Sequence, residues 1–156
     1  MVQGRLVTLP VVQGRLVTLL VIKREWLKMI LDGNKTWEIR SRACHIHVGK
    51  MLYLAESLQK SKKPGSASSW IKGRVMFVAC HGPLTQEEWD SNQSRHCVKS
   101  ASRYYGSHTY AYEFGSVEVA SHPVSFERKK GAVIFQKKVR IEESVLDKAE
   151  FKLVGG

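Results

Sequence analysis

The alternation of hydrophobic and polar positions predicts that most of this chain forms β-strands. The clearest alternation is in the middle of the chain, where Val75, Phe77 and Ala79 occupy every second position. Alternate side chains of a strand point to the same side, so these three would lie on one face of a sheet. The same reasoning predicts strands at 12–22, 35–40, 50–56, 71–80, 110–120 and 132–141.

A helical period replaces the strand period directly after the first predicted strand. Residues 23–32 place four apolar side chains on one helical face, namely Trp26, Leu27, Ile30 and Leu31. Gly33 follows where a C-terminal cap is expected, because glycine adopts the left-handed conformation without a steric cost. We therefore expect a short helix that ends in a turn at Gly33.

Helical signals recur at three later places. Thr85 and Glu88 form a capping-box pattern, in which the side chain of each residue bonds to the backbone of the other. A second helical stretch is predicted from His96 to Tyr105. A capping pattern also precedes residues 145–153, which are expected to close the chain as a short helix.

The predicted strands lie mostly too close together in the sequence for helical crossovers between them. This spacing favours a largely antiparallel, barrel-like sheet with helices at its rim over a parallel sheet. We therefore expect an α+β fold, with a β-barrel of about six mostly antiparallel strands and two or three short helices.

The first twenty residues contain a direct repeat, because Val2–Leu9 recurs unchanged as Val12–Leu19. A ten-residue period that occurs twice is too short for a solenoid unit. The second copy continues into the apolar residues 20–22, so it is expected to hold the first strand. We expect residues 1–11 to be either an artefact or a flexible arm, and residues 12–156 to form a single domain.

The charge balance is strongly positive. Lysine and arginine number 25 against 14 for aspartate and glutamate, which leaves a net charge of +11 and a pI near 9.8. Such an excess favours a polyanionic partner, nucleic acid first and an acidic membrane surface second, although it could also serve solubility alone. No apolar run approaches the ~20 residues of a membrane span, so a membrane protein is not expected.

The three cysteines are widely spaced and odd in number, so neither a disulfide framework nor paired metal knuckles can be built from them. An intracellular location, in the cytoplasm or nucleus, is therefore expected. Potential metal ligands cluster weakly, as Cys44, His45 and His47 with Cys80, His81 or His96. They lack the regular spacing of a structural zinc site, so no metal or other cofactor is predicted.

Gly33–Arg40 places three charged residues in a short extended segment. Glu38 and Arg40 would share a face, with Trp37 and Ile39 on the opposite face towards the core, while Lys35 lies at the turn. Lysine and arginine donors would suit a phosphate or a base edge, and Glu38 could orient Arg40 or accept from an exocyclic amine. The alternative is an ion-pair ladder that only braces the sheet.

The order of several short sequence segments resembles that of the ASCH-domain family of the PUA-like superfamily. These are the segment GNKTWEIR at 33–40, a Gly-led strand at 48–55, the segment IKGRV at 71–75, a Leu-Thr-x-Glu-Glu helix start, a Tyr-rich strand at 110–114 and a Pro-Val segment leading to Lys130-Gly131. The resemblance covers roughly Val12 to Ile141, and Gly33–Arg40 is its most specific part. It implies a PUA-like β-barrel with an RNA-facing cleft.

The resemblance implies more than one activity. Family members bind RNA, some small bacterial members are amidohydrolases that act on N4-acylated cytidine, and a ribonuclease activity is described for others. The amidohydrolase site has a Lys, a Thr three residues on and a distant Glu. Lys35 matches the Lys, but the position three residues on is Glu38, so the nucleophile is absent. RNA binding is therefore preferred, and an enzyme would use Lys35, Glu38 and His96.

Basic and aromatic residues outside this segment complete the predicted RNA-binding surface. Cations neutralise phosphates, and flat aromatic rings stack on unpaired bases. The predicted RNA-binding residues are Lys35, Arg40, Trp70, Lys72, Arg74, Tyr104, Tyr105, Arg128, Lys129 and Lys130. The expected partner is single-stranded RNA. Protein partners in transcription coactivation are suggested only by analogy with the family.

Overall fold

We describe the chain from a computed structural model, which defines residues 14–56, 68–127 and 135–154. The duplicated segment 1–11 and the basic residues Arg128, Lys129 and Lys130 lie outside the described residues. The elements are, in order, β1 (Gly14–Ile22), α1 (Arg24–Leu31), β2 (Trp37–Arg40), the 3-10 turn η1 (His45–His47), β3 (Met51–Glu56), β4 (Ser68–His81), α2 (Gln86–Ser91), α3 (Gln93–His96), the 3-10 turn η2 (Gly106–His108), β5 (Tyr110–Glu127), β6 (Phe135–Glu142), α4 (Glu143–Lys148) and β7 (Phe151–Leu153).

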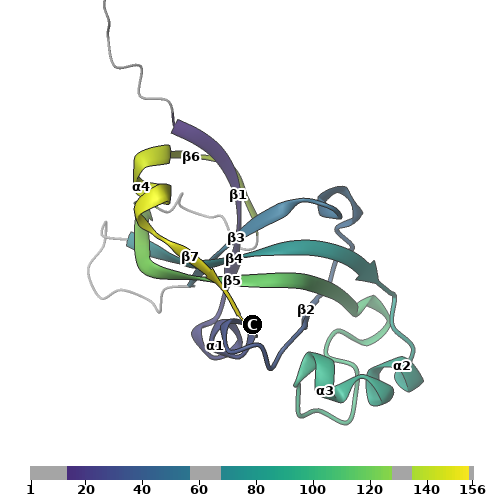
Figure 1. The fold of residues 1–156 in the computed structure, drawn as a ribbon. Coiled ribbons are helices and arrows are strands. Elements are labelled where there is room, and N and C mark those ends of the chain that lie inside the picture. The colour runs from purple at the N-terminus through teal and green to yellow at the C-terminus, as the bar shows by residue number, and fades with distance from the viewer. Residues whose placement is uncertain (1–13, 57–67, 128–134, 155–156) are drawn as a thin grey trace, which may run out of the picture.

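The strands form one curled sheet with the order β2-β5-β4-β3-β1-β6, and β7 pairs with β5 outside this path (Figure 1). The pair β1–β3 is parallel, and the other strand pairs are antiparallel. Helices α2 and α3 lie together beyond the ends of β4 and β5, whereas α4 lies at the opposite end of the sheet (Figure 1). The prediction of an α+β, barrel-like and mostly antiparallel fold is confirmed.

Strand β1 is buried on both of its faces. Leu19 and Val21 pack into one hydrophobic cluster, while Leu20 and Ile22 pack into a second cluster with the apolar face of α1. Burial on both faces is typical of a strand inside a sheet, and it explains why this segment reads as a continuous apolar run. The central strands therefore form the buried framework of the sheet, with α1 packed against one face and β2 at the edge beside β5.

Two predicted helices differ from the observed structure. Helix α3 ends at His96, and residues 98–105 form no helix, because Cys97 adopts a left-handed conformation (φ 61°) and Val98 N–H bonds to the His96 ring instead of continuing the helix. The closing helix is also shorter than predicted. Helix α4 stops at Lys148, Glu150 turns the chain with φ 49°, and the last residues form β7.

Two strands are longer than predicted, because β5 continues past Pro123 to Glu127 and β4 begins at Ser68. The pairing between them shifts from Gly73↔Val119 to Ile71↔Val124. Pro123 therefore lies in an irregular stretch where no ladder hydrogen bond from its nitrogen is required.

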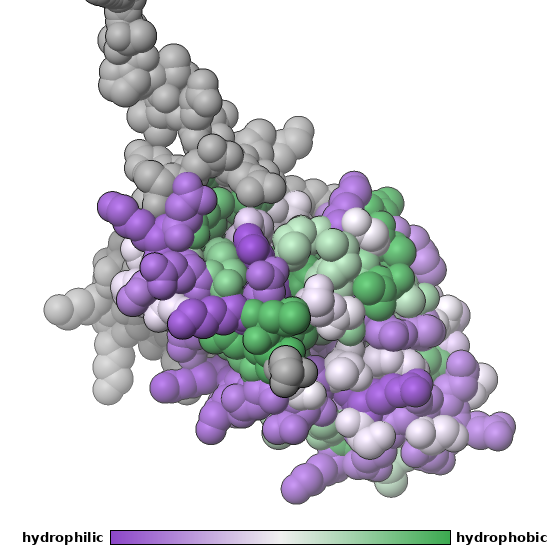
Figure 2. Space-filling model, in the orientation of Figure 1, coloured by the Kyte–Doolittle hydropathy of each residue, from purple (hydrophilic) through white to green (hydrophobic). Residues whose placement is uncertain are grey.

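The surface is mixed in polarity. Figure 2 shows hydrophobic patches separated by hydrophilic residues over the face that it draws. No helix within the described residues is long and apolar enough to span a membrane.

Candidate functional site

The turn between α1 and β2 sets the position of Lys35. Gly33 has φ 82°, in the left-handed region that glycine enters without strain. Its backbone N–H bonds to Ile30 O, and the N–H groups of Asn34 and Lys35 both bond to Met29 O. These bonds fix the backbone at the end of α1, as the sequence predicted, and they bring Lys35 back beneath the helix.

Lys35 is the most deeply buried charged residue within the described part of the chain, with 1% of its surface exposed. Its Nζ donates a hydrogen bond to the backbone oxygen of His96 and lies 3.8 Å from Glu38 Oε1. The same nitrogen lies 4.8 Å from the centre of the Trp26 ring, a cation–π distance. Burial lowers the pKa of Lys35 below its ordinary value, and the charge of Glu38 opposes that shift.

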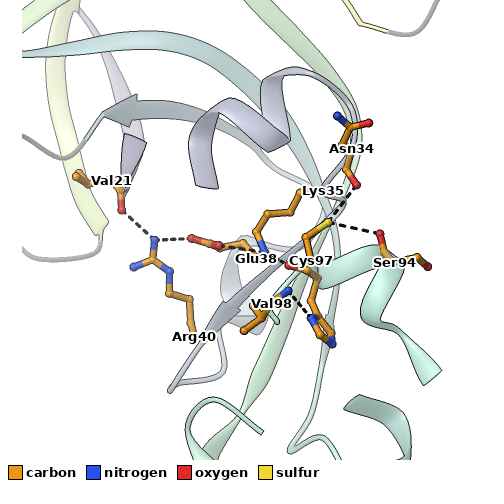
Figure 3. A network of polar contacts seen from close by, with 9 residues as sticks. Val21, Asn34, Lys35, Glu38, Arg40, Ser94, Cys97 and Val98 are labelled. Atoms are coloured by element: carbon orange, nitrogen blue, oxygen red, sulfur yellow. Dashed lines mark hydrogen bonds and ion pairs between the residues drawn. The ribbon is translucent and has the colours of Figure 1, made fainter. Parts of the chain in front are cut away.

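Glu38 joins Lys35 to Arg40 (Figure 3). Its Oε2 accepts a hydrogen bond of 2.8 Å from Arg40 Nη2, which also donates to Val21 O at 2.9 Å. Glu38 is 5% exposed, so the three charges do not form an ion-pair ladder at the surface. Arg40 Nε is buried and has no hydrogen-bond partner among the described residues.

These charged side chains line a pocket of about 220 Å³. Its lining residues are Val21, Lys23, Trp26, Lys35, Glu38, Ile39, Arg40, Val98, Tyr104 and Tyr105. Tyr104 and Tyr105 are 51% and 41% exposed, and their rings meet edge to face with centres 5.0 Å apart. The pocket therefore combines three cationic side chains, a single carboxylate and two aromatic rings open to solvent.

The ring of His96 does not line the pocket. Its Nε2 lies 2.9 Å from Trp89 O, its Nδ1 accepts from Val98 N–H at 2.9 Å, and the ring stacks on Trp89 with centres 3.9 Å apart. Burial lowers the pKa of His96, which favours the neutral ring that these two bonds require. The backbone oxygen of His96, which binds Lys35, belongs to the site, whereas its imidazole serves the loop as a structural group.

Trp70, Lys72 and Arg74 do not join Lys35 and Arg40 in this pocket. They lie along β4, where Lys72 pairs with Glu56 at 2.7 Å and Arg74 pairs with Glu118. These partners neutralise both cations, which lowers their value for binding phosphates. The single surface expected from the sequence is therefore divided, and of the predicted RNA-binding residues that the structure describes, only Lys35, Arg40, Tyr104 and Tyr105 line the pocket.

Sequence reasoning missed several pocket residues. Trp26 was predicted to be part of the apolar helix face, and it does pack against the core, but it also lines the pocket. Lys23, Val21 and Val98 were not selected. Trp26, nine residues before Lys35, gave a usable signal, because Trp26 lies in α1 and the turn at Gly33 brings Lys35 back beside that helix.

The fold and the pocket define a class of small α+β domains with a curled, barrel-like sheet and a cationic site at the rim. The ASCH domain family model matches residues 20–140, and the chain belongs to the ASCH-domain family. The structure is similar to a crystal structure of ASCH from Zymomonas mobilis, with a TM-score of 0.60, 12% sequence identity, and coverage of 88% of this chain and 96% of that chain. No curated protein matches the chain.

Proposed function

We propose that this ASCH domain binds single-stranded RNA and holds one nucleotide in the pocket beside β2. The observation that carries the proposal is the network of Lys35, Glu38 and Arg40, which is fixed by hydrogen bonds yet lines an open pocket. Buried charges are costly, so a group of them in a pocket often has a functional role.

The exposed rings support a single-stranded partner. Tyr104 and Tyr105 line the same pocket as the charges, and stacking on an aromatic ring contributes ~1–3 kcal/mol per base. Bases in a duplex are already stacked and cannot use these rings. Lys23, at the same pocket, adds an exposed cation for the phosphate backbone, and the net charge of +11 favours the approach of any nucleic acid.

Fluorescence anisotropy with a labelled ten-nucleotide RNA tests the proposal. The wild-type chain is expected to bind the single strand more tightly than the same sequence as a duplex, with an affinity that falls steeply as salt rises. The double variant Tyr104→Ala/Tyr105→Ala should bind roughly tenfold more weakly or worse, because its stacking faces are lost. Leu153→Ala, which also removes an exposed apolar side chain but lies on β7, should bind like the wild type.

Two results would contradict RNA binding at this pocket. One is the absence of measurable binding at low salt. The other is equal loss of affinity in Leu153→Ala and in the tyrosine variant, because such a loss would not depend on the pocket.

A small hydrolase acting on RNA or on N4-acylated cytidine is a second candidate. The specific observation in its favour is the lowered pKa of Lys35 in a pocket that also holds a carboxylate, since amines with lowered pKa values serve as bases or nucleophiles. The wild type and Lys35→Met should be incubated with labelled RNA and with N4-acetylcytidine. Turnover by the wild type that Lys35→Met lacks would establish hydrolysis, and no turnover by either protein would exclude it.

A further inference from the structure

We infer that the pocket selects guanine over the other three bases, with Glu38 as the residue that determines the choice. This inference rests on the proposed binding of RNA in the same pocket. It follows from the order in which hydrogen-bond donors and acceptors are arranged along the Lys35–Glu38–Arg40 network.

The network presents a donor, two acceptors and a second donor in sequence. Lys35 Nζ lies 3.8 Å from Glu38 Oε1, and Arg40 Nη2 lies 2.8 Å from Glu38 Oε2. Each oxygen of the carboxylate therefore has one cation beside it (Figure 3). The order of groups is fixed because Arg40 is also tied to Val21 O, and Lys35 is tied to the backbone of His96.

Glu38 has acceptor capacity to spare. An ionised carboxylate has about four lone-pair sites, and Lys35 and Arg40 account for two contacts within the described residues. One further site therefore remains on each oxygen. Donors also remain, because the third N–H group of Lys35 faces neither His96 O nor Glu38, and Arg40 Nη1 has no hydrogen-bond partner among the described residues.

Guanine is the base that complements this order of groups. Its edge presents the acceptor O6, the donors N1–H and N2–H, and then the acceptor N3. Two adjacent N–H donors match the two oxygens of one carboxylate, while O6 and N3 meet cations at either side. Uracil has a single N–H between two carbonyls, so one carboxylate oxygen would face a carbonyl. Cytosine and adenine each present one exocyclic amine beside an acceptor nitrogen, which would face the second oxygen.

The pocket also has room for a base and a surface on which to stack it. Its volume of about 220 Å³ admits a planar ring, and Tyr104 and Tyr105 line it. A site that hydrogen-bonds specific groups discriminates strongly, because a base without those groups leaves buried polar atoms unpaired.

The first experiment uses the wild-type chain alone. Labelled ten-nucleotide RNAs of uridines, each with a single central G, A, C, U or inosine, are compared by fluorescence anisotropy at one salt concentration. The G-containing RNA is expected to bind roughly 10- to 100-fold more tightly than those with A, C or U. Inosine lacks the N2 amine, so its RNA should bind several-fold more weakly than the RNA with G.

The second experiment compares Glu38→Gln with Glu87→Gln. The two variants change the net charge equally, but Glu87 is an exposed residue of α2 outside the pocket. An amide has one oxygen acceptor in place of two, so Glu38→Gln should lose the preference for G while Glu87→Gln keeps it. If Glu38→Gln fails to fold, the inosine comparison in the wild type still tests guanine selection, because equal affinity for the G and inosine RNAs would show that the N2 amine is not paired with the carboxylate.

The outcomes separate the two proposals. Equal affinity for all five RNAs, with the dependence on Tyr104 and Tyr105 intact, would overturn guanine selection and leave RNA binding in place. A preference for G that survives in folded Glu38→Gln would overturn the role of Glu38. No binding to any of these RNAs would overturn the proposed function itself, and guanine selection with it.

Discussion

Replacing Glu38 with glutamine should destabilise the protein more than replacing Lys35 with methionine. The Glu38 carboxylate pairs with two cations, since its Oε1 lies 3.8 Å from Lys35 Nζ and its Oε2 lies 2.8 Å from Arg40 Nη2. With an effective dielectric constant of 20, these attractions amount to about 4 and about 6 kcal/mol. In the wild type, the cost of removing the carboxylate from water cancels much of this attraction. The net loss should be about 3–5 kcal/mol, the range typical of removing one partner of a buried ion pair.

In Lys35→Met, the interactions that are lost are largely offset by the removal of a buried charge. The variant loses the hydrogen bond to His96 O, worth about 1.5–3 kcal/mol, and the cation–π contact with Trp26, worth up to about 2 kcal/mol. It also loses the attraction to Glu38, but it no longer buries an ammonium group, which costs several kcal/mol. Glu38 keeps Arg40 as its partner. The free energy of unfolding should therefore change by less than about 2 kcal/mol.

Urea unfolding followed by circular dichroism at pH 7 measures both changes, and thermal unfolding provides a second reading. A loss of 3–5 kcal/mol should lower the Tm of a domain of this size by about 6–20 °C. Glu87→Gln serves as the control for the amide substitution, since it lies in the exposed first turn of α2. The reasoning fails if Glu38→Gln costs less than about 1 kcal/mol, or if Lys35→Met is the more destabilised variant.

Two further predictions concern the pH dependence of Lys35 and the packing of a glycine. Burial lowers the pKa of Lys35 below its ordinary value of 10.5, so at pH values between the two the unfolded chain binds more protons than the folded chain. Across that window the free energy of unfolding of the wild type should therefore rise with pH relative to that of Lys35→Met. Urea titrations between pH 7 and 10.5 measure this difference, and a fall would contradict the burial argument. Gly73→Ala should cost about 1–3 kcal/mol, because its Cβ would lie 2.7 Å from Glu118 O and 2.5 Å from Leu31 Cδ2. Gly115→Ala should cost less in the same urea assay, because its Cβ would clash with the exposed Val78 side chain at 2.7 Å and would meet Met76 only at ordinary contact distances of 3.8 and 3.9 Å. Equal costs would contradict this reasoning.

The sequence was sufficient to predict the class of fold, because that class depends on local pattern. The strand period, the helix before Gly33 and the capping box of α2 are all decided within a few residues, and each is present. The errors fall where an individual side-chain contact or backbone conformation, and not the periodic pattern, decides the structure. The stretch after His96 has a helical sequence, but its conformation is set by the left-handed Cys97 and by the bond from Val98 N–H to the His96 ring. A periodic pattern cannot reveal such a bond.

The candidate site was predictable only in part, for a similar reason. Lys35, Glu38 and Arg40 are close in sequence, so a strand period was enough to bring Glu38 and Arg40 to one face. The ring chemistry of Tyr104 and Tyr105 predicts a role in stacking, and both residues line the pocket. Trp70, Lys72 and Arg74 have the same chemistry, yet they lie along β4, where Lys72 and Arg74 are paired with acidic residues. Composition identifies residues that could bind RNA, but only the sheet order decides which of them meet.

The identity of residue 38 links the stability of the pocket to its chemistry. Among ASCH-family members, the amidohydrolase site that the resemblance implies has a threonine three residues after the lysine, where this chain has Glu38. In this chain, a neutral hydroxyl at position 38 would leave both Lys35 and the mostly buried Arg40 without the carboxylate that lies between them. Glu38 and Arg40 therefore form a unit, since the glutamate is required once the arginine is buried beside Lys35. The same unit supplies two adjacent acceptors with a cation on each side, which is the arrangement on which the proposed recognition of guanine depends.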